Sequence, residues 1–169
     1  MVDASGTQVF GADATLTGVD ASGVLLGAAE GDWYAGIDPQ GAVRFEADLD
    51  GAMLRTWELH ADSVSAFTEG AVTPEGVPTI YADLDLRELG LERFTSEQGS
   101  AILVLDGDDV SVDVQCRSGG ENECAIVGGG NLQSGRFSFS VLELGAADGV
   151  RWENEGPVSF VMTPTYSGA

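Results

Sequence analysis

Residues 101–116 read AILVLDGDDVSVDVQC, and this stretch decides the fold class. In its second half three valines and Cys116 alternate with polar residues, which is the period-two pattern of a strand with one buried face. An apolar run precedes it, and Asp106-Gly107 between the two segments is a strong signal for a hairpin turn. The stretch therefore predicts two antiparallel strands joined by a tight turn.

The two cysteines of the chain, Cys116 and Cys124, come next and flank a polar segment. The apolar residues Ala125–Val127 follow and predict a third strand, so the cysteines are well placed for a disulfide across the hairpin. Closing a loop of about nine residues would stabilise the fold by about 2.5 kcal/mol through the entropy of the unfolded chain. Two buried free thiols are the alternative, because Cys116 falls on the apolar side of its strand.

The rest of the chain alternates between short apolar segments and turn residues. Two further Asp-Gly pairs, Asp50-Gly51 and Asp148-Gly149, predict hairpin turns. In Arg136–Leu144 the apolar residues change from one parity to the other, which indicates a bulge or burial on both faces. The other expected strands are Thr7–Phe10, Ala14–Val19, Val24–Ala28, Trp33–Ile37, Ala42–Ala47, Ala52–Leu59, Thr79–Leu86, Val150–Glu153 and Val158–Met162, with Val64–Phe67 open between a strand and a helical turn.

A short pattern repeats in the N-terminal part of the chain. Val2–Gly6 recurs as Val19–Gly23 and, more loosely, as Ile37–Gly41 and Val72–Gly76, with first spacings of 17 and 18 residues. Each copy combines an apolar residue, a polar side chain that can bond the turn backbone and a glycine that can adopt positive φ. The pattern favours hairpins in a meander, and a solenoid with one coil per repeat is the alternative.

One segment favours a helix. In residues 86–94, LRELGLERF, the side chains of Leu86, Leu89 and Phe94 could share one face, so a short helix or 3₁₀ turn is expected there.

The sequence as a whole predicts a single β domain over residues 1–169. Its expected architecture is all-β, an antiparallel β-sandwich or closed barrel of about a dozen short strands with at most one short helix.

The chain is strongly acidic. Twenty-eight acidic residues stand against seven arginines and no lysine, which gives a formal net charge of −21. A nucleic-acid partner is excluded because phosphate binding needs a basic surface, and an anionic membrane surface is disfavoured for the same reason. Two explanations stay open: adaptation to high ionic strength, where ions screen self-repulsion, or an acidic protein from a genome that favours arginine over lysine.

The expected location follows from the cysteines and the absence of targeting signals. No apolar run is long enough to span a bilayer, so membrane insertion is not expected. The first residues lack the basic and apolar regions of a signal peptide, so we expect either a cytoplasmic protein or a mature form whose leader has been removed. Because disulfides form in oxidising compartments, we expect an extracellular, cell-surface or particle-associated protein.

Calcium is the ion that the acidic residues favour, and no other cofactor is expected. Asp106, Asp108 and Asp109 cluster at one hairpin, and oxygen ligands from a turn suit Ca²⁺, although their spacing matches no standard calcium loop. The alternative is turn chemistry, which favours aspartate and glycine without any ion.

Three tryptophans are candidates for stacking on a carbohydrate ring. Trp33, Trp57 and Trp152 have the flat apolar surface that sugars contact, and the alternative is that they fill the core or protect an edge.

No catalytic residue is expected. His60 is the only histidine, and although Asp62, Ser63 and Ser65 are near it in sequence, no nucleophile motif surrounds them. The triple glycine at residues 128–130 lacks the lysine of a phosphate-binding loop and is expected to form a flexible loop.

These observations favour a non-catalytic structural or interaction domain. The expectation is a subunit of an extracellular, cell-surface or virus-like assembly that binds protein partners or itself and has an acidic surface suited to high ionic strength. The alternative is a secreted module that binds carbohydrate or calcium. An enzyme that uses carboxylates has no positive support in the sequence.

Overall fold

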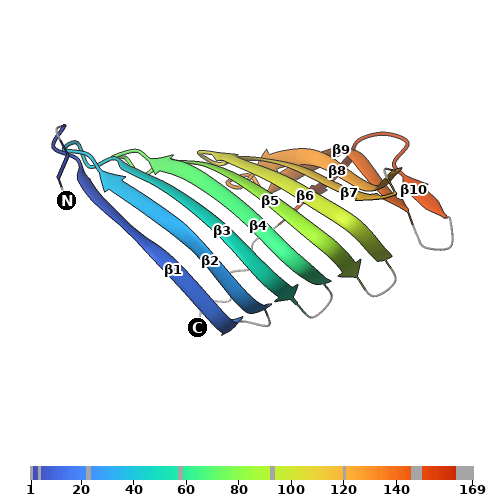
Figure 1. The fold of residues 1–169 in the computed structure, drawn as a ribbon. Coiled ribbons are helices and arrows are strands. Elements are labelled where there is room, and N and C mark those ends of the chain that lie inside the picture. Colours follow the sequence, from blue (N-terminus) through green and yellow to red (C-terminus); the bar gives the residue numbers. More distant parts are fainter. Residues whose placement is uncertain are drawn as a thin grey trace, which may run out of the picture.

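A computed structural model of the chain describes residues 2–3, 5–21, 24–56, 59–91, 94–119, 121–145 and 150–162. All regular structure in these ranges is β-strand (Figure 1). The strands are β1 (Gln8–Ala21), β2 (Val24–Ile37), β3 (Val43–Arg55), β4 (Leu59–Val72), β5 (Pro78–Leu91), β6 (Phe94–Asp106), β7 (Asp109–Ser118), β8 (Glu121–Asn131), β9 (Arg136–Gly145), β10 (Arg151–Glu153) and β11 (Val158–Val161).

All of these strands belong to one antiparallel sheet. Each strand from β1 to β10 pairs with the next one along the chain, and β11 pairs with β9. Among the described strands β1 pairs with β2 alone, so the sheet is not closed (Figure 1). The prediction of an all-β antiparallel fold is therefore confirmed.

The pairing register sorts the side chains into two faces. Residues directly opposite each other share a face, and successive residues of a strand point to opposite faces. One row crosses the sheet from Phe10 through Ala35 and Phe45 to Ile80, and the adjacent row on the other face contains Tyr34 and Glu46. The apolar face carries the large side chains Phe10, Trp33, Ile37, Val43, Phe45, Leu49, Val64, Ile80, Leu84, Leu86, Leu103, Leu105, Val110, Val112, Val114, Ile126, Phe137, Phe139, Leu142 and Leu144. The polar face carries the acids Asp13, Glu30, Asp32, Glu46, Asp48, Asp50, Glu69, Asp83, Asp85, Asp106, Asp109, Asp113, Glu143 and Glu153.

The first six strands repeat with a period of 35 residues. β1, β3 and β5 begin at residues 8, 43 and 78, and β2, β4 and β6 begin at residues 24, 59 and 94. Asp13, Asp48 and Asp83 occupy equivalent positions in the three hairpins, and an alanine precedes each of them. The repeating unit is one β-hairpin. The spacings of 17 and 18 residues seen in the sequence are the two halves of this unit, measured between turns at opposite ends of the sheet.

The turns at one end of the sheet are built alike. Asp38 Oδ1 accepts hydrogen bonds from the backbone N–H groups two and four residues later, both at 2.9 Å. Asp3 Oδ1 likewise accepts bonds from the N–H groups two and four residues later. Thr73 Oγ1 accepts one bond, from the N–H group four residues later. Each turn has a glycine three residues later (Gly6, Gly41 and Gly76), with φ between 85° and 89°. Residues with a Cβ atom rarely adopt this conformation. The predicted turn chemistry is confirmed in these three copies, and the copy at Val19–Gly23 ends outside the described residues.

A row of backbone kinks crosses the hairpins near the other end of the strands. Gly18, Met53 and Glu88 occupy equivalent positions and have φ of 60°, 58° and 52°. The ladder skips one residue pair at each kink, or two between β4 and β5, and the apolar positions change from a spacing of two to a spacing of three, as in Leu86 and Leu89. A spacing of three is also typical of a helix, which explains why the sequence favoured a helix for residues 86–94. That prediction is wrong. Residues 86–91 complete β5, and β6 begins at Phe94.

The Asp-Gly pairs behave differently from one another. Asp106-Gly107 ends β6 and opens the turn to β7, with φ of 60° at Gly107, so the hairpin predicted there is confirmed. Asp50-Gly51 lies inside β3, and the hairpin predicted there is wrong. Its aspartate belongs to the polar face, which explains how a turn-forming pair fits a strand. Asp148-Gly149 lies outside the described residues.

Expected neighbours such as Thr7–Phe10 and Ala14–Val19 merge into single long strands, and Val64–Phe67 is part of β4.

The triple glycine at residues 128–130 lies within β8, so the flexible loop predicted there is wrong. The ring of Phe139 occupies the space that a Cβ on Gly128 would need, and Phe137 does the same at Gly130. Glycine in a strand therefore allows an aromatic ring from the next strand to lie across it. Phe139 pairs with Gly128 and Val141 with Val127, which leaves Ser140 as an extra residue in β9 and confirms the predicted bulge.

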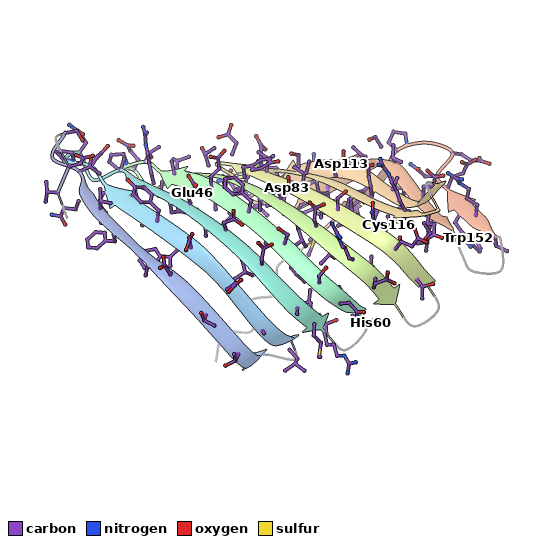
Figure 2. The ribbon with its side chains drawn as sticks, viewed as in Figure 1. Glu46, His60, Asp83, Asp113, Cys116 and Trp152 are labelled. Carbon is purple, nitrogen blue, oxygen red and sulfur yellow. A yellow bond between two sulfur atoms is a disulfide. The ribbon has the colours of Figure 1, made fainter. Side chains whose placement is uncertain are left out.

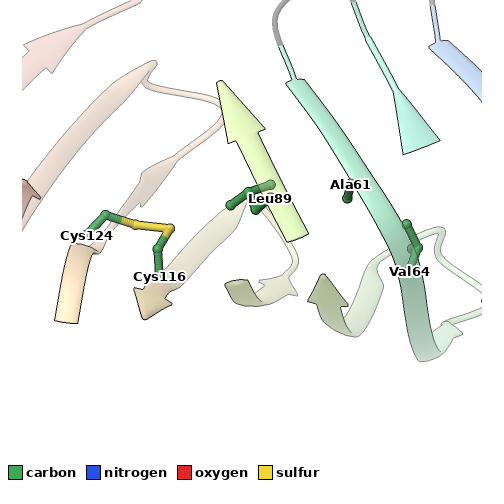
Figure 3. Close-up of a cluster of buried hydrophobic side chains, with 5 residues drawn as sticks. All are labelled: Ala61, Val64, Leu89, Cys116 and Cys124. Carbon is green, nitrogen blue, oxygen red and sulfur yellow. A yellow bond between two sulfur atoms is a disulfide. The ribbon is translucent and has the colours of Figure 1, made fainter. Parts of the chain in front are cut away.

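The buried residues gather around the disulfide. Cys116 of β7 and Cys124 of β8 are direct cross-strand partners, with Cα atoms 4.8 Å apart, and the predicted disulfide joins them. Ala61, Val64 and Leu89 pack with the two cysteines on the apolar face (Figure 3). These five side chains are 1–6% exposed, so the cluster is the small interior of the sheet.

Candidate functional site

The apolar face has no second layer over it in the part of the chain that the structure describes. Phe10, Trp33 and Leu103 on this face are 47%, 44% and 41% exposed. The whole chain exposes 11396 Å², whereas a compact monomer of this mass exposes about 7,900 Å². The chain therefore exposes about 3,500 Å² more than a compact monomer of this mass.

The apolar face also lacks charge. From the row that contains Gln8 to the row that contains Cys116, every described position on this face is apolar, glycine or an uncharged polar residue. Monomeric proteins rarely expose contiguous apolar patches larger than a few hundred Å², and larger ones mark interaction sites. This face is therefore the strongest candidate for a functional surface.

A row of aspartates crosses the polar face. Asp13, Asp32 and Asp48 are direct cross-strand neighbours on β1, β2 and β3, and the same row continues through Asp83 and Asp113. A side-chain hydrogen bond from Asp13 and the negative charges of Asp13 and Asp48 raise the pKa of Asp32. Figure 2 shows Glu46, Asp83 and Asp113 on three strands of the sheet. At neutral pH this face presents dense negative charge to water.

The polar face is hollowed between β3 and β7. The hollow has a volume of about 700 Å³, and its side chains include Asp50, Asp85, Arg87, Gln98 and Arg117. Two rows of the face line it, and the backbone between them forms its floor. Along β7 the side chains form a chain of hydrogen bonds, from the guanidinium of Arg117 to Gln115 at 2.7 Å and from the Gln115 amide to Asp113 at 3.3 Å. The hollow offers several hydrogen-bond donors and acceptors to a polar ligand.

The aspartates predicted to bind calcium make other contacts. Asp109 Oδ1 accepts a hydrogen bond from the Asn131 amide at 2.8 Å, and Asp106 Oδ1 accepts one from the Thr79 hydroxyl at 3.4 Å. Asp108 lies in the turn, where its backbone carbonyl accepts a hydrogen bond from the next hairpin. Among the described residues no group of three or more Asp, Glu, His or Cys side chains is placed to hold a metal ion. Calcium binding stays a prediction.

The tryptophans do not form one platform. Trp33 and Trp152 both belong to the apolar face, on β2 and β10, and are separated by most of the sheet. Trp57 lies outside the described residues. Phe67 and Tyr81 form an aromatic pair on the polar face, with ring centroids 6.5 Å apart. Neither was selected from the sequence, which singled out the tryptophans for stacking.

His60 lies near the start of β4, away from Asp83 and Asp113 (Figure 2). Its ring covers Gly90, the residue opposite it on β5. It borders an open hollow with Asp62, Glu88 and Glu97. No hydrogen bond or ion pair joins the side chain of His60 to any residue that the structure describes, and the nearby serines 63 and 65 line the other hollow.

The sequence-based reasoning missed the aspartate row. The signal was present as a tripled Ala-Asp pair at residues 12–13, 47–48 and 82–83, which recurs every 35 residues. A search for repeats at the length of a whole hairpin, instead of the spacing between turns, would have found it.

Comparison of the chain with known protein families, with curated proteins and with solved structures gave no match. None of the described residues forms a helix long and apolar enough to cross a bilayer.

Proposed function

We propose that this chain is a non-catalytic structural module that binds another protein surface through its apolar face. The observation that carries the proposal is the separation of the sheet into an uncharged apolar face and a densely acidic one. Burial of apolar surface is the main favourable term in protein association, about 25 cal/mol per Å². An apolar face that extends across the sheet gains much of that energy when another surface covers it.

The acidic face has the complementary role. Its carboxylates repel one another and remain hydrated, so this side of the sheet stays in water while the other side is covered. The disulfide between Cys116 and Cys124 supports assembly in an oxidising compartment, such as a cell surface or an extracellular particle. The charge supports an environment of high ionic strength, in which self-repulsion is screened.

Binding of a neutral apolar dye tests the proposal. Nile red is added to dilute protein at low salt, and Leu103→Arg is compared with Ile102→Arg. Leu103 (41% exposed) and Ile102 (38% exposed) are adjacent in β6 and lie on opposite faces. We expect Leu103→Arg to lose at least half of the dye fluorescence and Ile102→Arg to keep it. Equal dye binding by both variants and the wild type would contradict a functional apolar face.

A second candidate function is binding of a carbohydrate in the hollow of the polar face. Its supporting observation is the set of hydrogen-bonding side chains around that hollow, with Phe67 and Tyr81 on the same face. Sugars are bound by such mixtures of polar side chains and aromatic rings. Calorimetric titration with a panel of neutral and acidic oligosaccharides tests it, with Arg87→Ala as the site variant and Arg44→Ala as the control. No heat from any of them would reject this candidate.

A further inference from the structure

The apolar face is large enough to form a stable interface, and this inference rests on the proposed function. Its rows extend over about ten residues of each strand, about 30 Å, and over β1 to β9, about 40 Å. The face therefore presents about 1,200 Å². Two such faces in contact would bury about 2,400 Å², which lies in the range of obligate dimers, about 2,000–5,000 Å².

The chemistry of the face selects an uncharged partner. A partner that placed a charge against it would bury that charge without a counter-charge, which is unfavourable. A second copy of the same face meets this condition at every position. It also leaves both acidic faces on the outside, where their carboxylates stay in water. Because packed sheets lie about 10 Å apart and the carboxylates project outward from both, the two sets of charges are separated by more than one Debye length at 0.1 M salt.

The shape of the face suits a copy of itself. Large side chains alternate with small ones along the rows: Phe10 and Phe45 are separated by Ala35, and Trp33 stands between Ala12 and Ala47. The alternation continues into the second hairpin, where Gly70 separates Phe45 from Ile80, and ends in the third, where Ile80 lies opposite Leu105. A face with regular ridges and pits can accept the ridges of a second copy in its pits, as a two-fold interface requires.

We propose that two copies of this chain pack apolar face to apolar face and form a two-layer β-sandwich with both acidic faces outside. Aligned sheets pack with their strands about 30° apart, and side chains from the two inner faces interdigitate. The disulfide cluster then lies at one end of a continuous interior shared by the two copies.

The first test uses the wild-type protein without any substitution. Trp33 and Tyr34 are neighbours in β2, are both 44% exposed and lie on opposite faces. Hydroxyl-radical footprinting with mass spectrometry is carried out at 1 M KCl over a series of protein concentrations, alongside sedimentation equilibrium. We expect oxidation of Trp33 to fall in step with the dimer fraction, by at least about fivefold, while oxidation of Tyr34 stays constant.

The second test uses the matched variants of β6. Leu103→Arg places a charge in the interface, so we expect its dimer dissociation constant to rise at least about 100-fold. Ile102→Arg places the same charge on the polar face, and we expect the dimer to be retained. Far-UV circular dichroism and the intact disulfide confirm that each variant is folded, and the footprinting of the wild type remains decisive if Leu103→Arg does not fold.

The outcomes separate this inference from the proposed function. A dimer that Leu103→Arg leaves unchanged would overturn the face-to-face arrangement and indicate pairing of strand edges. A wild-type monomer with reactive Trp33 would overturn the second copy as the partner and leave the face open for a different protein. A monomer with protected Trp33 would overturn both, because the chain would then cover its own apolar face.

Discussion

Asp13 of β1 and Asp32 of β2 lie directly opposite each other, close enough for a side-chain hydrogen bond between their carboxyl groups. Two carboxyl groups can share such a bond only when one of them holds a proton. The bond and the nearby charges of Asp13 and Asp48 therefore raise the pKa of Asp32 above its ordinary value. The folded chain holds this proton more tightly than the unfolded chain does.

Replacement of Asp32 tests this relationship through the pH dependence of stability. Because the folded-state pKa is raised, the pair stabilises the fold when Asp32 is protonated, and this stabilisation is lost as the pH rises through the raised pKa. At pH 7 the ionised pair is repulsive. We expect Asp32→Asn to melt a few degrees above the wild type at pH 7 in 0.1 M salt, and the difference to shrink as the pH falls towards 3. Thermal unfolding followed by circular dichroism measures both.

The matched control is Asp85→Asn. Asp85 lies on the same face, but its cross-strand neighbours are Ser65 and Ser100. We expect a smaller increase in melting temperature for this variant at pH 7. Equal increases for the two variants would show that total charge, and not the Asp13–Asp32 pair, sets the effect.

Salt is expected to stabilise the protein through the acidic face. The net charge of −21 is concentrated on strands that also bring carboxylates into contact across the sheet. The Debye length falls from about 10 Å at 0.1 M to about 3 Å at 1 M, which weakens this repulsion. We expect the melting temperature to rise by several degrees between 0.1 M and 2 M KCl. A flat or falling curve would leave codon usage as the explanation of the composition.

The disulfide is expected to contribute about 2.5 kcal/mol to the free energy of unfolding, since it closes a loop of about nine residues. The double variant Cys116→Val, Cys124→Val keeps apolar side chains at both buried positions and removes the link. Urea unfolding of this variant, compared with the oxidised and the reduced wild type, measures the contribution. Alkylation of two thiols in the protein before any reductant is added would show that the bond is not formed.

The kink at Glu88 is expected to cost stability. Its φ of 52° lies in the left-handed region, where a residue with Cβ is strained by about 1 kcal/mol, whereas the equivalent position in the first hairpin is Gly18. We expect Glu88→Gly to raise the free energy of unfolding by about 0.5 kcal/mol, because relief of strain exceeds the entropy gained by the unfolded chain. Glu69→Gly, in the extended part of β4, should lower it by about 1 kcal/mol. A loss of stability in both variants would rule out strain at the kink.

The fold class could be predicted because one face alternates cleanly. In β7 the valines at 110, 112 and 114 mark the apolar side, and in β5 the residues from Ile80 to Leu86 do the same. The lengths of the strands could not be predicted as readily. Polar and glycine residues on the water-facing side, such as Asp50-Gly51, have the composition of turns, yet a face that remains in water tolerates them within a strand.

The errors at Leu86–Leu89 and at residues 128–130 have separate physical causes. A kinked residue changes the apolar spacing from two to three, and local sequence does not distinguish that spacing from a helical one. The glycines of β8 are dictated by the rings of Phe137 and Phe139, which come from the next strand and are known only once the pairing is known. The uncovered apolar face was not predicted either, because the alternation of a strand shows that one side avoids water but not what covers it.

The hairpin period makes the width of the sheet adjustable. Strands contact their immediate neighbours almost exclusively, so each unit interacts with the unit on either side and little else. If residues 38–72 were excised, Thr73 would follow Ile37, and Pro78 would take the place opposite Ile37 that Val43 holds now. A shortened chain of this kind would keep its turns, its kinks and its two-sided character. The number of hairpins therefore sets the width of the surface that the molecule can present to a partner.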